Sequence, residues 1–333
     1  GQALTLVSGT AATTITGNIG AGTALTGLTI TNGTANGTIT FGGNIGDGSG
    51  AGVEGTTSIG NTNTADLNFN STIYSFDGAT TITAASGDNI DIAAGAATTF
   101  TTAADNITFA TGNIELANGS DLTVDTGAAG GNITIGEIAG TTVETVTLDA
   151  GTGTTSVGVI GSGTEIGVVS IGSAQNGGIT LNGAITTDGS VTIDGPVTLA
   201  TGAISVTTAN DAITFNHTID GGQALTLVSG TAATAIQGTI GGTTAISSLT
   251  ITNGTAAGTI EIANIEGVTG ATAVGNTNTA TITLDGTTYS TAGTQTYTAK
   301  AGQNIDITGA ATFTTTNSNI SFATSGVDLA NNG

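Results

Sequence analysis

His217 is the only histidine of the chain, and histidine is the residue type best suited to acid–base chemistry near neutral pH. It lies in the segment FNHTID, where Asn216, Thr218 and Asp220 could be its neighbours. A catalytic histidine needs a nucleophile and an orienting group within hydrogen-bond reach, and no nucleophile stands out beside it. We therefore interpret His217 as an ordinary surface or corner residue and expect that the chain is not an enzyme.

The carboxylates could form two other kinds of site, because paired acids cleave glycosidic bonds and acids in Gly-rich corners bind calcium. The acids in the middle of the chain are scattered singly, as solvated edge and corner residues are. They are Glu115, Asp121, Asp125, Glu137, Glu144, Asp149 and Glu165. Asp47 in NIGDGSG and Asp88 in GDNIDI are the candidate Ca²⁺ ligands, although neither the calcium nonapeptide nor the EF-hand spacing occurs. Apart from Ca²⁺ at these corners, we expect no cofactor.

Threonine pairs of the form Thr-x-Thr raise the possibility of a flat hydroxyl face that binds ice. They are Thr29/Thr31, Thr38/Thr40, Thr81/Thr83, Thr250/Thr252, Thr281/Thr283 and Thr312/Thr314. Ice binding requires such a pair at the same corner of nearly every structural repeat, and these pairs are irregularly spaced. Because threonine prefers strands in general, we interpret the pairs as outward strand positions.

Composition constrains the elements that must position these residues. The formal net charge is −22, from 23 Asp and Glu against one cation, Lys300. Nucleic acid and anionic membrane surfaces are therefore disfavoured as partners, since binding to phosphate needs clustered Lys and Arg. Cysteine is absent, which excludes disulfides and thiolate metal sites, and no apolar run is long enough for membrane insertion. Hydrophobic residues make up 37% of the chain, which is enough for a thin, distributed core.

A long internal repeat organises the chain. The segment GQALTLVSGTAAT occupies residues 1–13 and returns at residues 222–234. Three shorter identical segments follow in the same order: LTITNGTA at 28–35 and 249–256, GNTNTA at 60–65 and 275–280, and NIDI at 89–92 and 304–307. Long, near-identical repeats are typical of arrays and fibres. We therefore expect a first long repeat, residues 1–221, and a second, partial copy, residues 222–333, within a longer polypeptide.

A shorter period lies inside the long one. Apolar residues occur in alternating units such as LTL at 4–6, ITF at 39–41 and VTI at 191–193, and period two predicts strands with one buried face. Asn-Gly and Asp-Gly pairs between the units supply sharp turns. The units align at steps of 23 or 24 residues, as from Leu4 to Leu28, Leu122 to Val146, Val146 to Val169 and Leu225 to Leu249.

Steps of this size predict an all-β parallel β-solenoid whose coils have about 20–24 residues and continue through both copies of the long repeat. A uniform coil would give roughly 15 coils, each one strand spacing from the next. Inward Ile, Leu, Val and Phe would form apolar columns, and outward Thr and Asn would form neutral ladders. Ionised side chains at equivalent positions would repel. A string of immunoglobulin-like sandwiches is the competing fold, but it favours buried Trp and longer strands, and Trp is absent here.

The phrase AITFNHTIDGGQALTLVSGTAATAIQGTIGGTTAISSLTITNGT, residues 212–255, resembles the repeat of very large filamentous-haemagglutinin-like bacterial adhesins. The stretch GTQTYTA, residues 293–299, resembles it as well. This resemblance implies a right-handed parallel β-helix, export across the cell envelope and a role as a surface adhesin or stalk. The near absence of Lys and Arg departs from many such proteins.

We therefore expect a segment of a secreted cell-surface fibre, located outside the cell, that acts as an adhesin or rigid stalk in cell–cell or cell–surface attachment. The alternative is a self-assembling extracellular filament, sheath or surface-layer protein without a specific receptor. An ice-binding or carbohydrate-active solenoid is less favoured, the latter because polysaccharide lyases of this shape use Arg or Lys and this chain has no Arg. The expected partners are other copies of the chain, end to end or side by side, and cell-surface glycans or proteins.

Overall fold

A computed structural model describes residues 1–33, 36–48, 50–141, 143–173, 177–254, 258–323 and 326–329. These residues form 36 strands, whose parallel stacked coils make an all-β solenoid of about 13 turns. The predicted fold class is therefore confirmed. Across the described ranges, no helix is long and apolar enough to cross a membrane.

The chain consists of two compact units, Gly1–Gly177 (unit 1) and Gly178–Gly333 (unit 2). The predicted boundary of the long repeat, after residue 221, falls within unit 2. Because a sequence repeat and a compact unit are different divisions of the chain, the boundary of the repeat stays a prediction.

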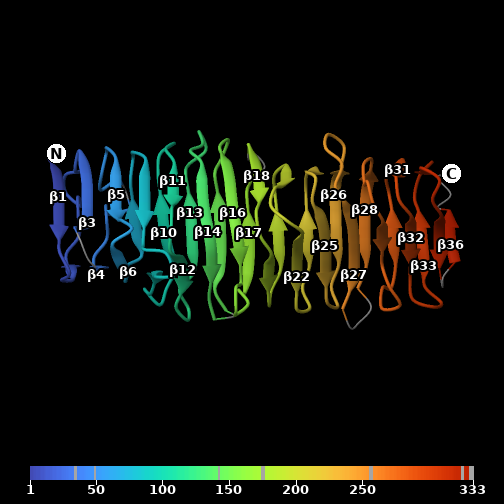
Figure 1. Cartoon of the computed structure of the whole chain (residues 1–333), viewed down its shortest axis with the longest axis horizontal. Helices are drawn as coiled ribbons and strands as arrows, with labels where there is room; N and C mark the ends of the chain where they lie inside the picture. Colours follow the sequence, from blue (N-terminus) through green and yellow to red (C-terminus); the bar gives the residue numbers. More distant parts are fainter. Residues whose placement is uncertain are drawn as a thin grey trace. The chain divides into compact units, whose positions relative to one another are not determined.

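In unit 1, successive coils follow one another in chain order (Figure 1), and the strand pairings form three columns of parallel strands. The first column is β1 (Ala3–Ser8), β3 (Gly27–Asn32), β5 (Thr57–Gly60), β8 (Thr80–Thr83), β11 (Ile107–Phe109), β14 (Ile133–Ala139) and β16 (Thr154–Ile160). The second column is β2 (Thr13–Ile15), β4 (Gly37–Phe41), β6 (Thr64–Phe69), β9 (Asn89–Ile92) and β12 (Asn113–Leu116), followed by the ends of β14 and β16. The third column is β7 (Ile73–Ser75), β10 (Thr98–Thr101), β13 (Leu122–Asp125), β15 (Thr145–Asp149) and β17 (Val168–Ile171).

Unit 2 has the same arrangement. Its first column is β18 (Gly178–Leu181), β21 (Val197–Leu199), β24 (Ile219–Asp220), the ends of β26 (Thr234–Ile240) and β28 (Ile260–Ile265), β31 (Thr288–Thr291) and β34 (Thr312–Thr315). The second column is β19 (Ile185–Thr187), β22 (Ile204–Thr208), β25 (Ala224–Ser229), β27 (Ser248–Asn253), β29 (Thr272–Val274), β32 (Gln295–Thr298) and β35 (Ile320–Ala323). The third column is β20 (Val191–Ile193), β23 (Ile213–Phe215), β26, β28, β30 (Ile282–Leu284), β33 (Asn304–Ile307) and β36 (Gly326–Leu329).

The predicted short period appears in the strand register. The opposite pairs are Leu4 and Leu28, Leu122 and Val146, Val146 and Val169, and Leu225 and Leu249. Other coils depart from this period, because the coil from Leu181 to Leu199 is shorter and the coil from Leu28 to Thr57 is longer. The longer coil includes the Gly-rich segment 42–56. Such longer coils are why about 13 turns are found where a uniform coil predicted more.

Apolar side chains on alternate strand positions form the core. In β3, Leu28 and Ile30 are buried, whereas Thr29 between them is half-buried and faces outward. The β-branched residues of these short strands favour the extended conformation, so that local preference and burial agree. Each coil buries its apolar side chains against the coils before and after it, and stability is therefore a sum over neighbours.

Aromatic rings gather in one cluster in each unit. The rings of unit 1 are Phe41, Phe69, Tyr74, Phe100 and Phe109, and those of unit 2 are Tyr289, Tyr297, Phe313 and Phe322. Phe100 stacks on Tyr74 with 4.8 Å between ring centroids and meets Phe69 edge-on at 5.1 Å. In unit 2, Phe313 stacks on Tyr289, also at 4.8 Å.

A polar corner that contains a buried asparagine recurs in both copies of the long repeat. It is formed by Ser8, Thr13 and Asn32 in unit 1 and by Ser229, Thr234 and Asn253 in unit 2. The Asn32 amide donates to the Ser8 hydroxyl at 2.9 Å, and the Asn253 amide donates to the Ser229 hydroxyl at 3.0 Å. Both asparagines are fully buried. Because a buried amide is costly without hydrogen-bond partners, these contacts stabilise the two asparagine NH₂ groups inside the coils.

Candidate functional site

The structure pairs His217 with an acid that its sequence neighbourhood does not contain. The imidazole Nε2 of His217 lies 3.3 Å from Asp194 Oδ1, and the His217 side chain is 41% exposed. Asp220, the predicted neighbour, instead accepts hydrogen bonds from the backbone N–H groups of Thr243 and Thr244 at 2.8 and 2.9 Å. Asp220 is therefore engaged by another coil, and His217 lies at an exposed coil corner with Asp194.

The two candidate Ca²⁺ ligands, Asp47 and Asp88, lie at different corners of unit 1. Asp47 is exposed beside a shallow pocket of about 180 Å³ whose other lining residues are Gly and Ala. Asp88 is half-buried, and its backbone N–H donates to the Ala85 carbonyl at 3.1 Å. Within the described ranges, no group of three or more His, Cys, Asp or Glu side chains is arranged to hold a metal ion. Calcium binding stays a prediction.

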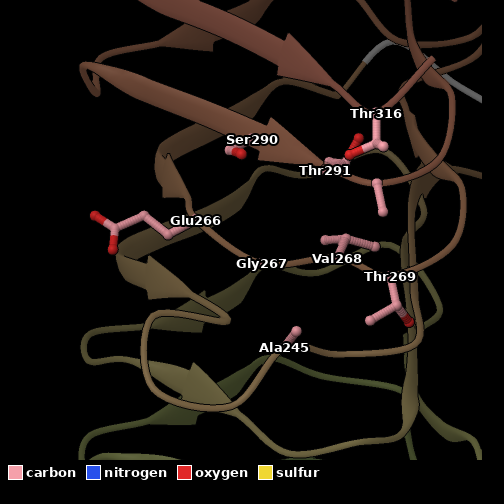
Figure 2. Close-up of a pocket in the computed structure, with 9 residues that line it drawn as sticks. Ala245, Glu266, Gly267, Val268, Thr269, Ser290, Thr291 and Thr316 are labelled. Atoms are coloured by element: carbon pink, nitrogen blue, oxygen red, sulfur yellow. The ribbon is translucent and has the colours of Figure 1, made fainter. Parts of the chain in front are cut away.

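The hollow shown in Figure 2 lies on unit 2 and has a volume of about 210 Å³. Thr269, Thr291 and Thr316 supply hydroxyl groups to its lining, together with small side chains such as Ala245. Glu266 is its one acid, and Figure 2 shows the Glu266 carboxylate directed away from the other lining side chains. Small-molecule sites enclose about 300–1,000 Å³ and converge a few polar groups on the ligand. This hollow has neither property.

Acids do occupy equivalent positions on neighbouring coils, which corrects the expectation that they are scattered singly. The opposite pairs are Asp91 and Glu115, Asp125 and Asp149, and Asp306 and Asp328. Burial, and then the charges of Asp66 and Glu115, raise the pKa of Asp91. An acid whose pKa is raised by folding lowers stability at neutral pH, so that this pairing is unfavourable there.

Glu144 also departs from the expectation of a solvated acid, because it is fully buried. Its carboxylate accepts hydrogen bonds from the backbone N–H groups of Thr141 at 2.7 Å, Val143 at 3.3 Å and Gly119 at 3.2 Å, and from the Thr141 hydroxyl. Burial alone raises the pKa of Glu144, but the hydrogen bonds from Thr141 and Gly119 outweigh it, and the pKa is lowered. Glu144 therefore joins the corner at Gly119 to the next coil through a hydrogen bond.

A regular polar feature of unit 1 is a column of hydroxyl groups on its first strand column. Its members, one per coil, are Thr5, Thr29, Ser58, Thr81, Thr108, Thr134 and Ser156. All are exposed or half-buried. Neighbouring strands are about 4.8 Å apart, so that the hydroxyl groups form a ladder with that spacing. We call this set the hydroxyl ladder.

The hydroxyl ladder is one residue wide where the ice-binding interpretation needs a pair. Thr31, the second threonine of the Thr29/Thr31 pair, lies opposite Val7, and Thr83 lies opposite Gly60. A flat array of paired hydroxyls is therefore interrupted at these coils. The hydroxyl ladder confirms the expectation that outward Thr side chains form a neutral ladder, since the short period of the sequence brings Thr5 and Thr29 together.

Three comparisons with known proteins complete this description. A scan against protein-family models, a search of curated proteins and a search of solved structures each gave no match to the chain.

Proposed function

We propose that the chain is a segment of a secreted, repetitive β-solenoid fibre that stands on the cell surface and acts as an adhesin or rigid stalk. The observation that carries this proposal is the hydroxyl ladder, a row of equivalent, uncharged hydrogen-bonding groups on successive coils. Many weak, equivalent contacts on one support give strong attachment without a deep pocket. The proposed partners are cell-surface glycans or proteins and other copies of the chain.

The remaining surface supports a role in lateral contact. The hollow of unit 2 shown in Figure 2 is small and gathers no convergent charged groups, so that it does not resemble a small-molecule site. The net charge of −22 disfavours nucleic acid and anionic membranes as partners. The resemblance to filamentous-haemagglutinin-like repeats adds export across the cell envelope to this proposal.

A receptor-free structural filament is the second candidate, and the position of the aromatic rings favours it. Recognition surfaces are enriched in exposed Tyr and Trp, which supply rigid contact area. Here Tyr74, Tyr289 and Tyr297 are fully buried, and Trp is absent from the sequence. A solenoid without such anchors would act through its length and stiffness alone.

Adhesion by beads of controlled coating density separates the two candidates. We expect beads densely coated with the chain to bind whole cells or immobilised polysaccharides, with an apparent affinity roughly 10²–10⁴ above that of the soluble chain. The matched variant replaces Thr29, Thr81 and Thr134 by alanine, which removes three ladder hydroxyls and leaves the inward positions intact. Weaker adhesion by this variant supports the proposal. Absence of adhesion at every coating density contradicts an adhesin and leaves the filament.

A further inference from the structure

On the side of the first coil of unit 1 (residues 1–25) that faces away from β3, β1 contacts no other described strand, and the same sequence is buried elsewhere in the chain. We call this side the open edge. Strands β1 and β25 both read ALTLVS. In unit 2, β22 covers β25, and Leu225 and Leu227 are fully buried. The matching Leu4 and Leu6 are only half-buried. The same strand therefore has a neighbour on this side in unit 2, whereas no described strand lies on this side in unit 1.

Two glycines of the first coil leave space that a preceding coil would fill. A Cβ atom added at Gly9 or Gly17 would meet no other atom within 4 Å. At the matching positions of unit 2, Gly230 and Gly238, a Cβ atom would overlap the backbone of the coil that carries β22 and β23. Neither pair has a positive φ, so that close approach, and not backbone conformation, is what requires glycine at the unit 2 positions.

The open edge also lacks charged side chains. The first 46 residues carry no charged side chain, in a protein whose net charge is −22. A second acidic chain could therefore approach this edge without meeting like charges there.

We propose that the open edge of the first coil binds the coil formed by residues 200–221 of another copy of the 221-residue repeat, in the register that β22 and β25 show. The opposite pairs would be Ile204 with Leu4, Val206 with Leu6, and Thr208 with Ser8. The end of the repeat thus matches its own beginning, and copies of the repeat can be added indefinitely through one junction. This inference rests on packing and does not depend on the adhesive role.

The junction also carries a specific polar contact. In unit 2 the Asp220 carboxylate accepts hydrogen bonds from two successive backbone N–H groups, those of Thr243 and Thr244. The matching positions of the first coil are Gly22 and Thr23. Because backbone donors do not depend on the side chain, Asp220 of another copy would be capped in the same way.

The test joins residues 178–221 to the amino end of the complete chain and follows amide hydrogen exchange in β1. We expect exchange in Ala3–Ser8 to slow at least about tenfold relative to the unextended chain, because the open edge gains hydrogen-bond partners. An extension of equal length with residues 98–141 is the sequence control and should leave exchange unchanged. Absence of slowing with residues 178–221, or equal slowing with both extensions, overturns the proposal.

Glycine variants test the register. Gly9→Ala combined with Gly17→Ala should leave the unfolding midpoint of the unextended chain unchanged, since both positions face open space. In the extended chain the same pair should abolish the slowing of exchange in β1. Gly230→Ala combined with Gly238→Ala is the matched control and should destabilise the unextended chain. Slow exchange that persists in the Gly9/Gly17 variant contradicts the proposed register.

Discussion

Replacing Phe100 by alanine should lower the free energy of unfolding by about 3–5 kcal/mol. The Phe100 side chain is fully buried and lies among three rings, with centroid distances of 4.8 Å to Tyr74, 5.1 Å to Phe69 and 5.4 Å to Phe109. Alanine would remove these contacts and leave a cavity that the surrounding coils cannot close without moving the backbone. Denaturant unfolding followed by circular dichroism measures the loss.

Two other variants show whether burial of Phe100 by neighbouring coils causes this loss of stability. Phe100→Leu keeps most of the volume and should cost less than the alanine variant. Phe313 aligns with Phe100 in the second copy of the repeat and also stacks on a tyrosine, but it is only half-buried. Phe313→Ala should therefore cost less than Phe100→Ala. Equal losses at the two positions would contradict a core stabilised by coils on both sides.

Replacing Glu144 by alanine should lower the free energy of unfolding by about 1.5–3 kcal/mol at pH 7. The loss has a specific cause, because the N–H groups of Gly119, Thr141 and Val143 would be left without their charged acceptor. Glu144→Gln preserves the shape of the side chain but places one NH₂ group against N–H donors, so that it should recover only part of the stability.

The pH dependence of the unfolding free energy shows whether the charge of the Glu144 carboxylate is what stabilises the fold. Folding lowers the pKa of Glu144 below its usual value of 4.5, so that its contribution is complete above that pH and is lost as the pH falls through the lower pKa of the folded state. The difference in unfolding free energy between the parent chain and Glu144→Gln should therefore shrink below pH 4.5. Taking this difference cancels the titration of the other acids. A difference that does not change with pH would contradict the role of the charge.

Period and pattern in the sequence were sufficient to predict the solenoid. Leu4, Leu28 and Leu122 begin short alternating units, and the predicted partners of these units are their partners in the strand register. The coil from Leu28 to Thr57 could not be predicted, because the Gly-rich residues before Thr57 carry no regular apolar pattern. Local sequence thus predicts strands well and the lengths of long corners poorly.

Some features of the candidate sites could also be predicted from the sequence, and others could not. The pairing of Asp91 with Glu115 follows from the short period and could have been read from the sequence. The burial of Glu144 could not, because one of its donors, the N–H of Gly119, lies on another coil and has no side-chain signature. The pairing of His217 with Asp194 resembles that of Asp91 with Glu115, since the two residues are one step of the short period apart and the contact could have been read from the sequence.

Immunogold electron microscopy of intact cells that produce the chain tests the proposed surface fibre most directly. Antibodies against the chain should label the outside of unpermeabilised cells, and the gold particles should extend beyond the cell surface. We expect this because a repetitive solenoid stalk must be exposed to make lateral contacts. Permeabilisation should add little label. Label that appears only after permeabilisation would contradict the account.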